Sequence, residues 1–337
     1  MKSSHKSYTP GRERLVLLGL LAAALAAAVL SLCLGAVGLT PAQLLGAVQA
    51  GPEDLSGRIF WFVRLPRTLA ALLTGAALAV SGVVIQTVLH NPLAAPNIIG
   101  VNAGAGFAVA LGAVFFPGAA VFYPGLSFAG AMLAVILVLG LSQFTGAARI
   151  TLVLGGVMIS SLFGALIDTL LTFWPDALTG YADFRVGSFS GITMGRVRSA
   201  AWPILISFCL LLTLAHPMEV LSLGDETART LGLNIRLLRI ALLMLAAVLA
   251  GCAVSMAGIV GFVGLIVPHF VRRLIGEKTL PLLAASALGG GCFVTLCDTA
   301  ARTVFSPYEL PVGIALSLIG VPVFLWQLIH TRRRQFD

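Results

Sequence analysis

The sequence predicts an all-α polytopic membrane protein with about ten transmembrane helices. Of its 337 residues, 58% are hydrophobic and only 10% are charged, whereas about a quarter of the residues in soluble domains are charged. The apolar runs exceed the roughly 18 residues that a spanning helix needs. They are rich in Leu, Ala, Val and Gly and lack the period-two alternation of membrane β-strands, so helices are expected.

Turns that contain Pro, Gly or charged residues divide the apolar sequence into ten expected spans. They cover residues 15–37, 65–89, 98–116, 127–144, 150–173, 200–215, 240–256, 259–275, 280–304 and 311–329. The first is too long for the apolar region of a signal peptide, so it is expected to remain as a span. The polar region 174–198 has room for a short helix. The whole chain, 1–337, is expected to form a single transmembrane domain.

Residues 217–239 form the one long polar interruption, PMEVLSLGDETARTLGLNIRLLR. Each charge in this segment would cost several kcal/mol in hydrocarbon. The segment must therefore face water, and it is long enough to form short helices of its own. We expect it to be a docking surface for a separate protein.

The distribution of positive charge predicts the orientation of the chain. An even number of spans puts both termini on one side, together with residues 217–239 and 14 of the 21 Lys and Arg residues. The positive-inside rule makes that side cytoplasmic. A net charge of +8 with no water-facing domain does not favour nucleic acid as a partner.

Seven arginines fall on the opposite side against this rule: Arg58, Arg64, Arg67, Arg185, Arg196, Arg198 and Arg302. Solvated or headgroup-facing side chains are one explanation. Arg64, Arg67 and Arg302 lie at span mouths next to prolines, and together they offer a basic rim to an acidic partner. Asp298 and Glu309 are near the same end of their segments and are placed to pair with Arg302.

Few residues suggest chemistry within the chain. It contains no phosphate-binding loop of the G-x-x-x-x-G-K-[ST] type. Its five cysteines lie in apolar spans without a C-x-x-C pair, and no His and carboxylate spacing suggests zinc. Asp168 is the one clear intramembrane acid. It is either a functional group or a carboxylate bonded to a neighbouring Ser or Thr, and both interpretations stay open.

Four ordered motifs that together span nearly the whole chain resemble one protein family. They are RLPRTLAALLTGAALAVSGVVIQTVLHNPLAAPNIIGVNAGAG (64–106), LGDETARTLGLN (223–234), GIVGFVGLIVPHFVRRLIG (258–276) and ELPVGIALSLIGVPVFLWQL (309–328). They resemble the permease subunits of bacterial ABC importers for iron chelates, haem and vitamin B12, the FecCD-type family.

The resemblance implies a vitamin-B12-permease-like (type II ABC importer) fold in the bacterial inner membrane. It implies a homodimer, or a pair with a close homologue, with the transport path at the dimer interface. Two ATPase subunits would dock on the cytoplasmic face and hold ATP and Mg, while this chain would bind no cofactor and act as no enzyme. A substrate-binding protein would dock outside.

The resemblance also implies roles for particular residues. The ATPase-coupling residues are Leu223, Gly224, Asp225, Glu226, Ala228, Arg229, Leu231 and Gly232. Binding-protein docking is implied for Arg64, Arg67 and Arg302. The cytoplasmic gate is implied at Asn91, Leu93, Gly146 and Ala147, although the junction TGAAR (145–149) is smaller and less hydroxylated than in the vitamin B12 permease.

The substrate is predicted from one stretch. FRVGSFSG (184–191) resembles the W-x-x-G-S-x-S-G stretch of ferric-siderophore permeases, with Phe184 in place of Trp. This favours a ferric chelate, with haem and vitamin B12 as alternatives. The alternative class is an ion-coupled secondary transporter, which would need intramembrane ionisable groups, and Asp168 is the one good candidate.

Overall fold

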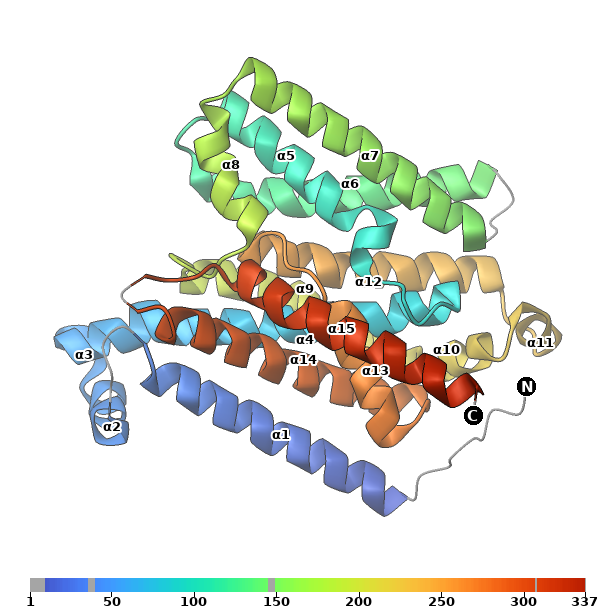
Figure 1. Ribbon diagram of the computed structural model, residues 1–337, viewed down its shortest axis with the longest axis horizontal. Helices are drawn as coiled ribbons and strands as arrows, with labels where there is room; N and C mark the ends of the chain where they lie inside the picture. The colour runs from blue at the N-terminus through green and yellow to red at the C-terminus, as the bar shows by residue number, and fades with distance from the viewer. Residues whose placement is uncertain (1–9, 36–39, 145–148, 307, 337) are drawn as a thin grey trace.

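The computed structural model describes residues 10–35, 40–144, 149–306 and 308–336. Within these ranges the chain forms helices and connecting turns, and no strand occurs (Figure 1). The helices that correspond to the ten expected spans are α1 (Pro10–Cys33), α4 (Leu65–Leu89), α5 (Val101–Phe115), α6 (Tyr123–Phe144), α7 (Arg149–Phe173), α9 (Met194–Thr213), α12 (Ile235–Ala257), α13 (Val263–Ile275), α14 (Thr279–Thr303) and α15 (Val312–Phe336). The predicted all-α polytopic fold is confirmed.

Hydropathy and length separate these helices into groups. Among the described residues, seven helical segments are long and apolar enough to cross a membrane: α1, the segment 55–89 that contains α4, the segment 120–144 that contains α6, and α7, α9, α12 and α14. Helix α5 and the apolar part of α15, Val312–Trp326, are shorter.

Helix α13 is shorter than the expected span 259–275. It begins only at Val263 and has 13 residues, a length of about 20 Å against about 30 Å of hydrocarbon. Gly258 ends α12 with φ +71°, and Phe262 has φ +66°, so the backbone between the two helices cannot be helical. This linker contacts the polar region instead, because the Ile259 amide donates to the Phe184 carbonyl at 2.9 Å.

Several short helices lie between the expected spans. They are α2 (Pro41–Ala50), η1 (Gly51–Glu53), α3 (Leu55–Arg58) and the π-helical turn η2 (Ile59–Arg64), which leads into α4. Local caps explain them: Thr40 and Gln43 form a capping box at α2, and the Asp54 carboxylate accepts from the Gly57 amide at 2.7 Å. Further on, η3 (Pro96–Ile99) and η4 (Ala120–Phe122) precede α5 and α6, and α8 (Ala177–Val186) is the short helix expected in region 174–198.

Helix α4 lies at the centre of the bundle. It packs most extensively against α14 and α12, with α1 on the far side of α14 and the α5–α6–α7 group across α12 (Figure 1). A close approach of two glycines permits the α4–α14 contact. A Cβ placed on Gly75 would lie 2.1 Å from the Gly290 carbonyl oxygen, and one on Gly290 would lie 2.2 Å from that of Gly75. Small residues at such contacts let membrane helices approach closely.

We expect Gly290→Val to destabilise the protein by about 1–3 kcal/mol, because the added methyl groups must push α14 away from α4. Thermal unfolding of the purified protein measures the effect. Gly164→Val is the matched control, since a Cβ at Gly164 in α7 meets nothing within 4 Å. Equal unfolding temperatures for the two variants would contradict the packing described.

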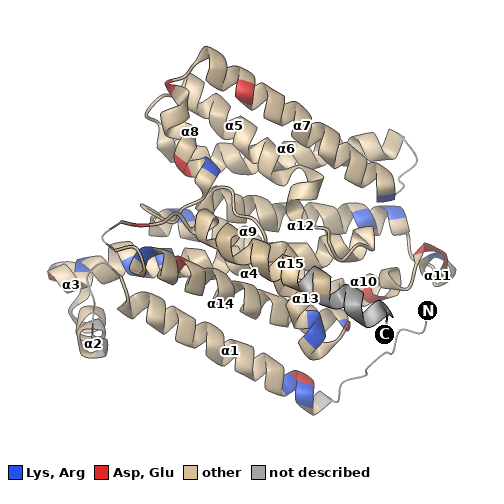
Figure 2. Ribbon diagram, in the orientation of Figure 1, with Lys and Arg blue, Asp and Glu red and all other residues tan. Residues whose placement is uncertain are grey.

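The helices run between two charged ends (Figure 2). One, the α11 end, gathers α11 (Asp225–Thr230), the starts of α1, α7 and α12, and the turn between α13 and α14. Lys278 pairs there with Glu13 at 2.8 Å, which holds the start of α1 beside the start of α14. The opposite end, the α3 end, carries α3, the start of α4 and the end of α14.

Candidate functional site

Residues 217–239 contribute to three helices at the α11 end. The first is the end of α10 (Ala215–Ser222), the second is α11, and the third is the start of α12. Gly224 and Gly232 separate them with φ of +115° and +82°, values that favour glycine. Acidic residues in the first turn of α11 and Arg229 in its last turn complement the helix dipole. The expectation of short helices in this segment is confirmed.

Helix α11 has an inward and an outward face. Ala228 is fully buried and Asp225 is partly buried, so this face rests on the bundle. Glu226 and Arg229 are exposed, and Leu223 and Leu231 are 63% and 62% exposed. Two exposed leucines thus flank the exposed charged side chains of α11.

Asp225 links α11 to two spans. Arg149, at the start of α7, donates to its carboxylate at 2.5 Å, and Arg239, in the second turn of α12, donates to both of its oxygens at 2.7 and 2.6 Å. Arg239 is buried. Asp225 therefore ties α11 to the starts of α7 and α12.

Burial of the carboxyl acts to raise the pKa of Asp225, but hydrogen bonds from Arg149 and Arg239, together with their charges, outweigh it and lower the pKa below its ordinary value. A lowered folded-state pKa stabilises the fold at every pH above the ordinary value, about 4. This contribution is lost as pH falls through the folded-state pKa.

We expect the difference in unfolding temperature between the wild-type protein and Asp225→Asn to be largest near neutral pH and to shrink as the pH falls below about 4. Thermal unfolding at a series of pH values checks this. A difference that stays constant or grows on acidification would contradict the ion-pair account.

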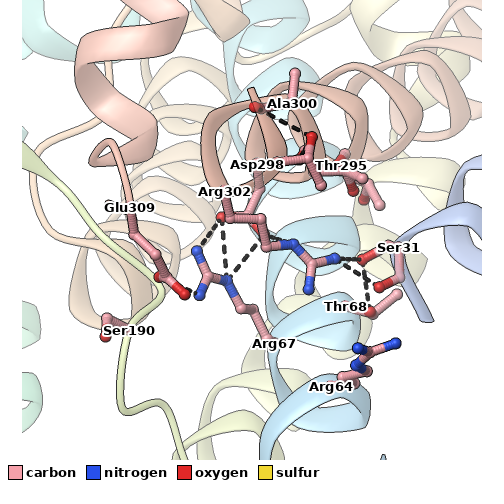
Figure 3. A network of polar contacts seen from close by, with 12 residues as sticks. Ser31, Arg64, Arg67, Thr68, Ser190, Thr295, Asp298, Ala300, Arg302 and Glu309 are labelled. Atoms are coloured by element: carbon pink, nitrogen blue, oxygen red, sulfur yellow. Dashed lines mark hydrogen bonds and ion pairs between the residues drawn. The ribbon is translucent and has the colours of Figure 1, made fainter. Parts of the chain in front are cut away.

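A second polar cluster lies buried at the α3 end (Figure 3). Arg67 of α4 pairs with Asp298 of α14 at 2.9 Å and with Glu309 at 2.7 Å. Arg302, one turn after Asp298, lies 3.7 Å from its carboxylate and donates to the Ser31 carbonyl at 2.6 Å. We call these residues, with Arg64, the outer network. The expected Asp298–Arg302 pair is present, whereas Glu309 pairs with Arg67 instead.

The outer network also holds the end of α1. Arg64 donates to the carbonyls of Leu32 and Cys33 at 2.6 and 2.7 Å. The hydroxyls of Ser31 and Thr68 share a hydrogen bond of 2.7 Å. Basic side chains thus satisfy carbonyls that the last turn of α1 leaves without helical partners.

The three predicted docking arginines are buried in this conformation. Arg64, Arg67 and Arg302 are 3%, 6% and 5% exposed, whereas the Glu309 side chain is 45% exposed. Their guanidinium groups point into the protein. An acidic partner would reach them only by competing with Asp298, Glu309 and the α1 carbonyls.

A sequence model of the FecCD transport family matches residues 21–330. The chain belongs to this family. The hemin transport system permease protein HmuU of Yersinia pestis is 36% identical over 317 residues, which cover 86% of this chain and 93% of that protein. The achromobactin transport system permease protein CbrC of Dickeya dadantii is 37% identical over 336 residues, 96% of this chain and 93% of that one.

Another FecCD-family relative, the Fe(3+) dicitrate transport system permease protein FecD of Escherichia coli, is 36% identical over 307 residues, 90% of this chain and 95% of that protein. A solved structure of a metal-chelate type ABC transporter in an inward-facing conformation superposes with a TM-score of 0.82 at 33% identity, covering 94% of this chain and 99% of that one. This FecCD-family chain is therefore a multi-pass membrane permease with the fold that the resemblance implied.

The predicted gate of this FecCD-family member is only partly within the described residues, since Gly146 and Ala147 lie outside them. Asn91 and Leu93 form a turn after α4 in which the Asn91 side-chain oxygen accepts from the Leu93 amide at 2.9 Å, and Leu93 is exposed. Gln86 fixes this end of α4, because it donates to the Gly264 carbonyl at 3.1 Å and accepts from Arg272.

Asp168 lies on the exposed face of α7. Within the described residues no hydrogen bond or ion pair reaches its carboxylate; Thr172 donates instead to the Asp168 backbone carbonyl at 2.7 Å. The interpretation of Asp168 as a carboxylate bonded to a neighbouring Ser or Thr therefore finds no partner among the described residues. No sequence pattern predicts Ser31 and Thr68 as part of the outer network, since nothing marks two hydroxyls in different apolar spans as neighbours.

Proposed function

We propose that this FecCD-family chain is the permease subunit of an ATP-binding-cassette importer that moves an iron chelate, foremost a ferric siderophore, into the cytoplasm. One observation carries the proposal: a chain of this family presents a water-facing helix, α11, whose outer face is exposed and whose inner face is tied to two spans. The chain supplies the path, and a separate ATPase subunit hydrolyses ATP.

The proposed ATPase contact is the outer face of α11, with Glu226 and Arg229, together with the exposed Leu223 and Leu231 that flank the helix. Asp225 and Ala228 lie on the inner face and transmit the movement. ATP binding would close two ATPase subunits, shift α11 and move α7 and α12 between inward-open and outward-open arrangements. On this proposal the α11 end and both termini are cytoplasmic and the membrane is the bacterial inner membrane.

A second copy of the chain, or a close homologue, is proposed to complete the path. Large apolar residues cover exposed faces of α7, including Leu154, Met158 and Leu162, and of α15, including Leu318 and Leu325. The α7 face also carries Asp168, and an ionised carboxylate facing lipid is costly. A water-filled path between two copies, with Asp168 beside it, accounts for both observations.

Outside, the α3 end is proposed to receive a substrate-binding protein. A cavity of about 660 Å³ opens there, and its lining includes Phe184, Ser188 and Ser190 of the predicted substrate stretch together with Asp183 and Glu309. Arg64, Arg67 and Arg302 remain the proposed docking residues. Their burial implies that docking would have to rearrange the outer network.

The substrate class rests on the relatives, which are named as permeases for hemin, achromobactin and Fe(3+) dicitrate. Together with the 184–191 stretch, they favour a ferric siderophore, with haem or vitamin B12 as alternatives. An ion-coupled secondary transporter is the less favoured class, because it would need more intramembrane ionisable groups than Asp168.

Co-expression with the ATPase and binding protein of the same system tests the assignment. We expect the ATPase to co-purify with the permease and the binding protein to retain a ferric siderophore, identified by mass spectrometry and iron analysis. Retention of haem or cobalamin would change the substrate, and failure of any ATPase to co-purify would contradict the importer proposal.

A further inference from the structure

A basic pocket lies beside α11, at the boundary between the spans and the water-facing segment. It has a volume of about 480 Å³ and is lined by the end of α6, the start of α7, α11 and the start of α12. Its charged lining residues are Arg149, Arg229, Arg236, Arg239 and Asp225. Four arginines and one carboxylate give the pocket a formal charge of +3, from 4 − 1.

The arginines keep donors for a further anion. The single carboxylate of Asp225 is shared between Arg149 and Arg239. Arg236 is exposed and donates to the Gln143 side chain at 2.8 Å, a neutral acceptor. Within the described residues the buried Nε of Arg149 has no acceptor, and Arg229 makes no ion pair. Guanidinium groups in this number favour a phosphate, which accepts several charge-assisted hydrogen bonds.

An apolar groove continues from this pocket along the outside of the bundle. It runs between α6 and α12, has a volume of about 590 Å³, and shares Leu139, Gln143, Arg236 and Ile240 with the pocket. The remaining lining residues are Ile136, Gly140, Phe144 and Met244. The groove is open, since Phe144 is 92% exposed and Ile136 is 52% exposed.

We propose that an anionic phospholipid binds here, with its phosphate headgroup in the basic pocket and an acyl chain in the groove. Basic pockets between spans at a membrane surface are suited to anionic headgroups. The groove favours a lipid over a soluble anion, because it lies on two spans and its lining is apolar apart from Gln143 and Arg236, which it shares with the pocket. An acidic segment of a partner protein would fill the pocket but leave the groove in hydrocarbon empty.

This site would connect the bilayer to the coupling segment. The headgroup would add a second anion to the arginines that already hold Asp225, and would so help to fix α11 against α7 and α12. The inference does not depend on which substrate the permease carries, because none of these residues lies in the cavity at the α3 end.

Native mass spectrometry of the delipidated permease, titrated with phosphatidylglycerol or phosphatidylcholine, tests the proposal. We expect the wild-type protein to retain phosphatidylglycerol in preference to phosphatidylcholine. Arg236→Gln should weaken phosphatidylglycerol binding about fivefold, the effect of one charge near a membrane surface. Ile240→Trp should weaken it by filling the groove without changing any charge. Inorganic phosphate should not displace the lipid.

Arg14→Gln is the matched control, because it removes an exposed arginine at the same end but outside the pocket. Equal phosphatidylglycerol binding by the wild-type protein, Arg236→Gln and Ile240→Trp would overturn the proposal. So would an equal loss in the Arg14→Gln control, which would indicate general surface charge. Displacement of the lipid by phosphate or by the ATPase would assign the pocket to a soluble anion or to the partner protein.

Discussion

Asp298→Ala is expected to lower the free energy of unfolding by roughly 3–5 kcal/mol, because it leaves two buried arginines without their shared carboxylate. The side chains of Arg67 and Asp298 are 7% and 1% exposed, so water cannot replace the lost partner. Arg302 would keep its bonds to Ser31 but lose its ion pair with Asp298. The change in unfolding temperature of the purified protein measures the loss.

Glu309→Gln is the control for Asp298→Ala. Glu309 bonds the same arginine, but its side chain is 45% exposed, and exposed ion pairs contribute at most about 1 kcal/mol. The outer network would be misassigned if the two variants were equally stable, or if Asp298→Ala unfolded like the wild-type protein.

Asp225→Ala is expected to reduce the substrate transported per ATP hydrolysed by about 5- to 150-fold, the range of a typical coupling free energy between two sites. The substitution removes the link from α11 to Arg149 and Arg239 but leaves the outer face of α11 unchanged. ATPase binding should therefore remain while coupling is lost. Proteoliposomes that contain the whole importer allow uptake and hydrolysis to be measured together.

Leu231→Glu should affect ATPase binding instead of coupling, because this exposed side chain lies directly after α11, next to its outer face. It should weaken co-purification with the ATPase, whereas Asp225→Ala should not. Thr230→Ala, on an exposed residue of the same helix, is the matched control and should leave both properties unchanged. Loss of ATPase binding in Asp225→Ala would show that its role is docking and not transmission.

The sequence predicts most of the fold because span length and hydropathy are local properties. It also predicts the water-facing segment, since charges in 217–239 cannot lie in hydrocarbon. The late start of α13 was missed because one left-handed residue, Phe262, delays it, and hydropathy does not register backbone conformation. The helices α2 and α3 were missed because short capping interactions, which hydropathy does not register, stabilise them between the first two expected spans.

In the candidate sites, too, the sequence predicts local contacts but not those between distant segments. Asp298 and Arg302 are one helical turn apart, so their pairing follows from spacing. The bond from Arg67 to Asp298 joins residues 231 positions apart, and the bonds from Arg64 to the end of α1 involve backbone carbonyls that no side-chain pattern marks. The pairing of Asp225 with Arg149 likewise cannot be read from spacing, because the packing of the whole bundle decides where the start of α7 lies.

Uptake into proteoliposomes tests the central claim most directly. Vesicles would contain the permease with or without its ATPase, with ATP enclosed, and would receive the ferric-siderophore-loaded binding protein outside. If ATP hydrolysis drives import, iron is taken up only when both ATP and the ATPase are present. The rate of uptake then does not change when a proton gradient is imposed. Uptake driven by that gradient in vesicles without the ATPase would contradict the account.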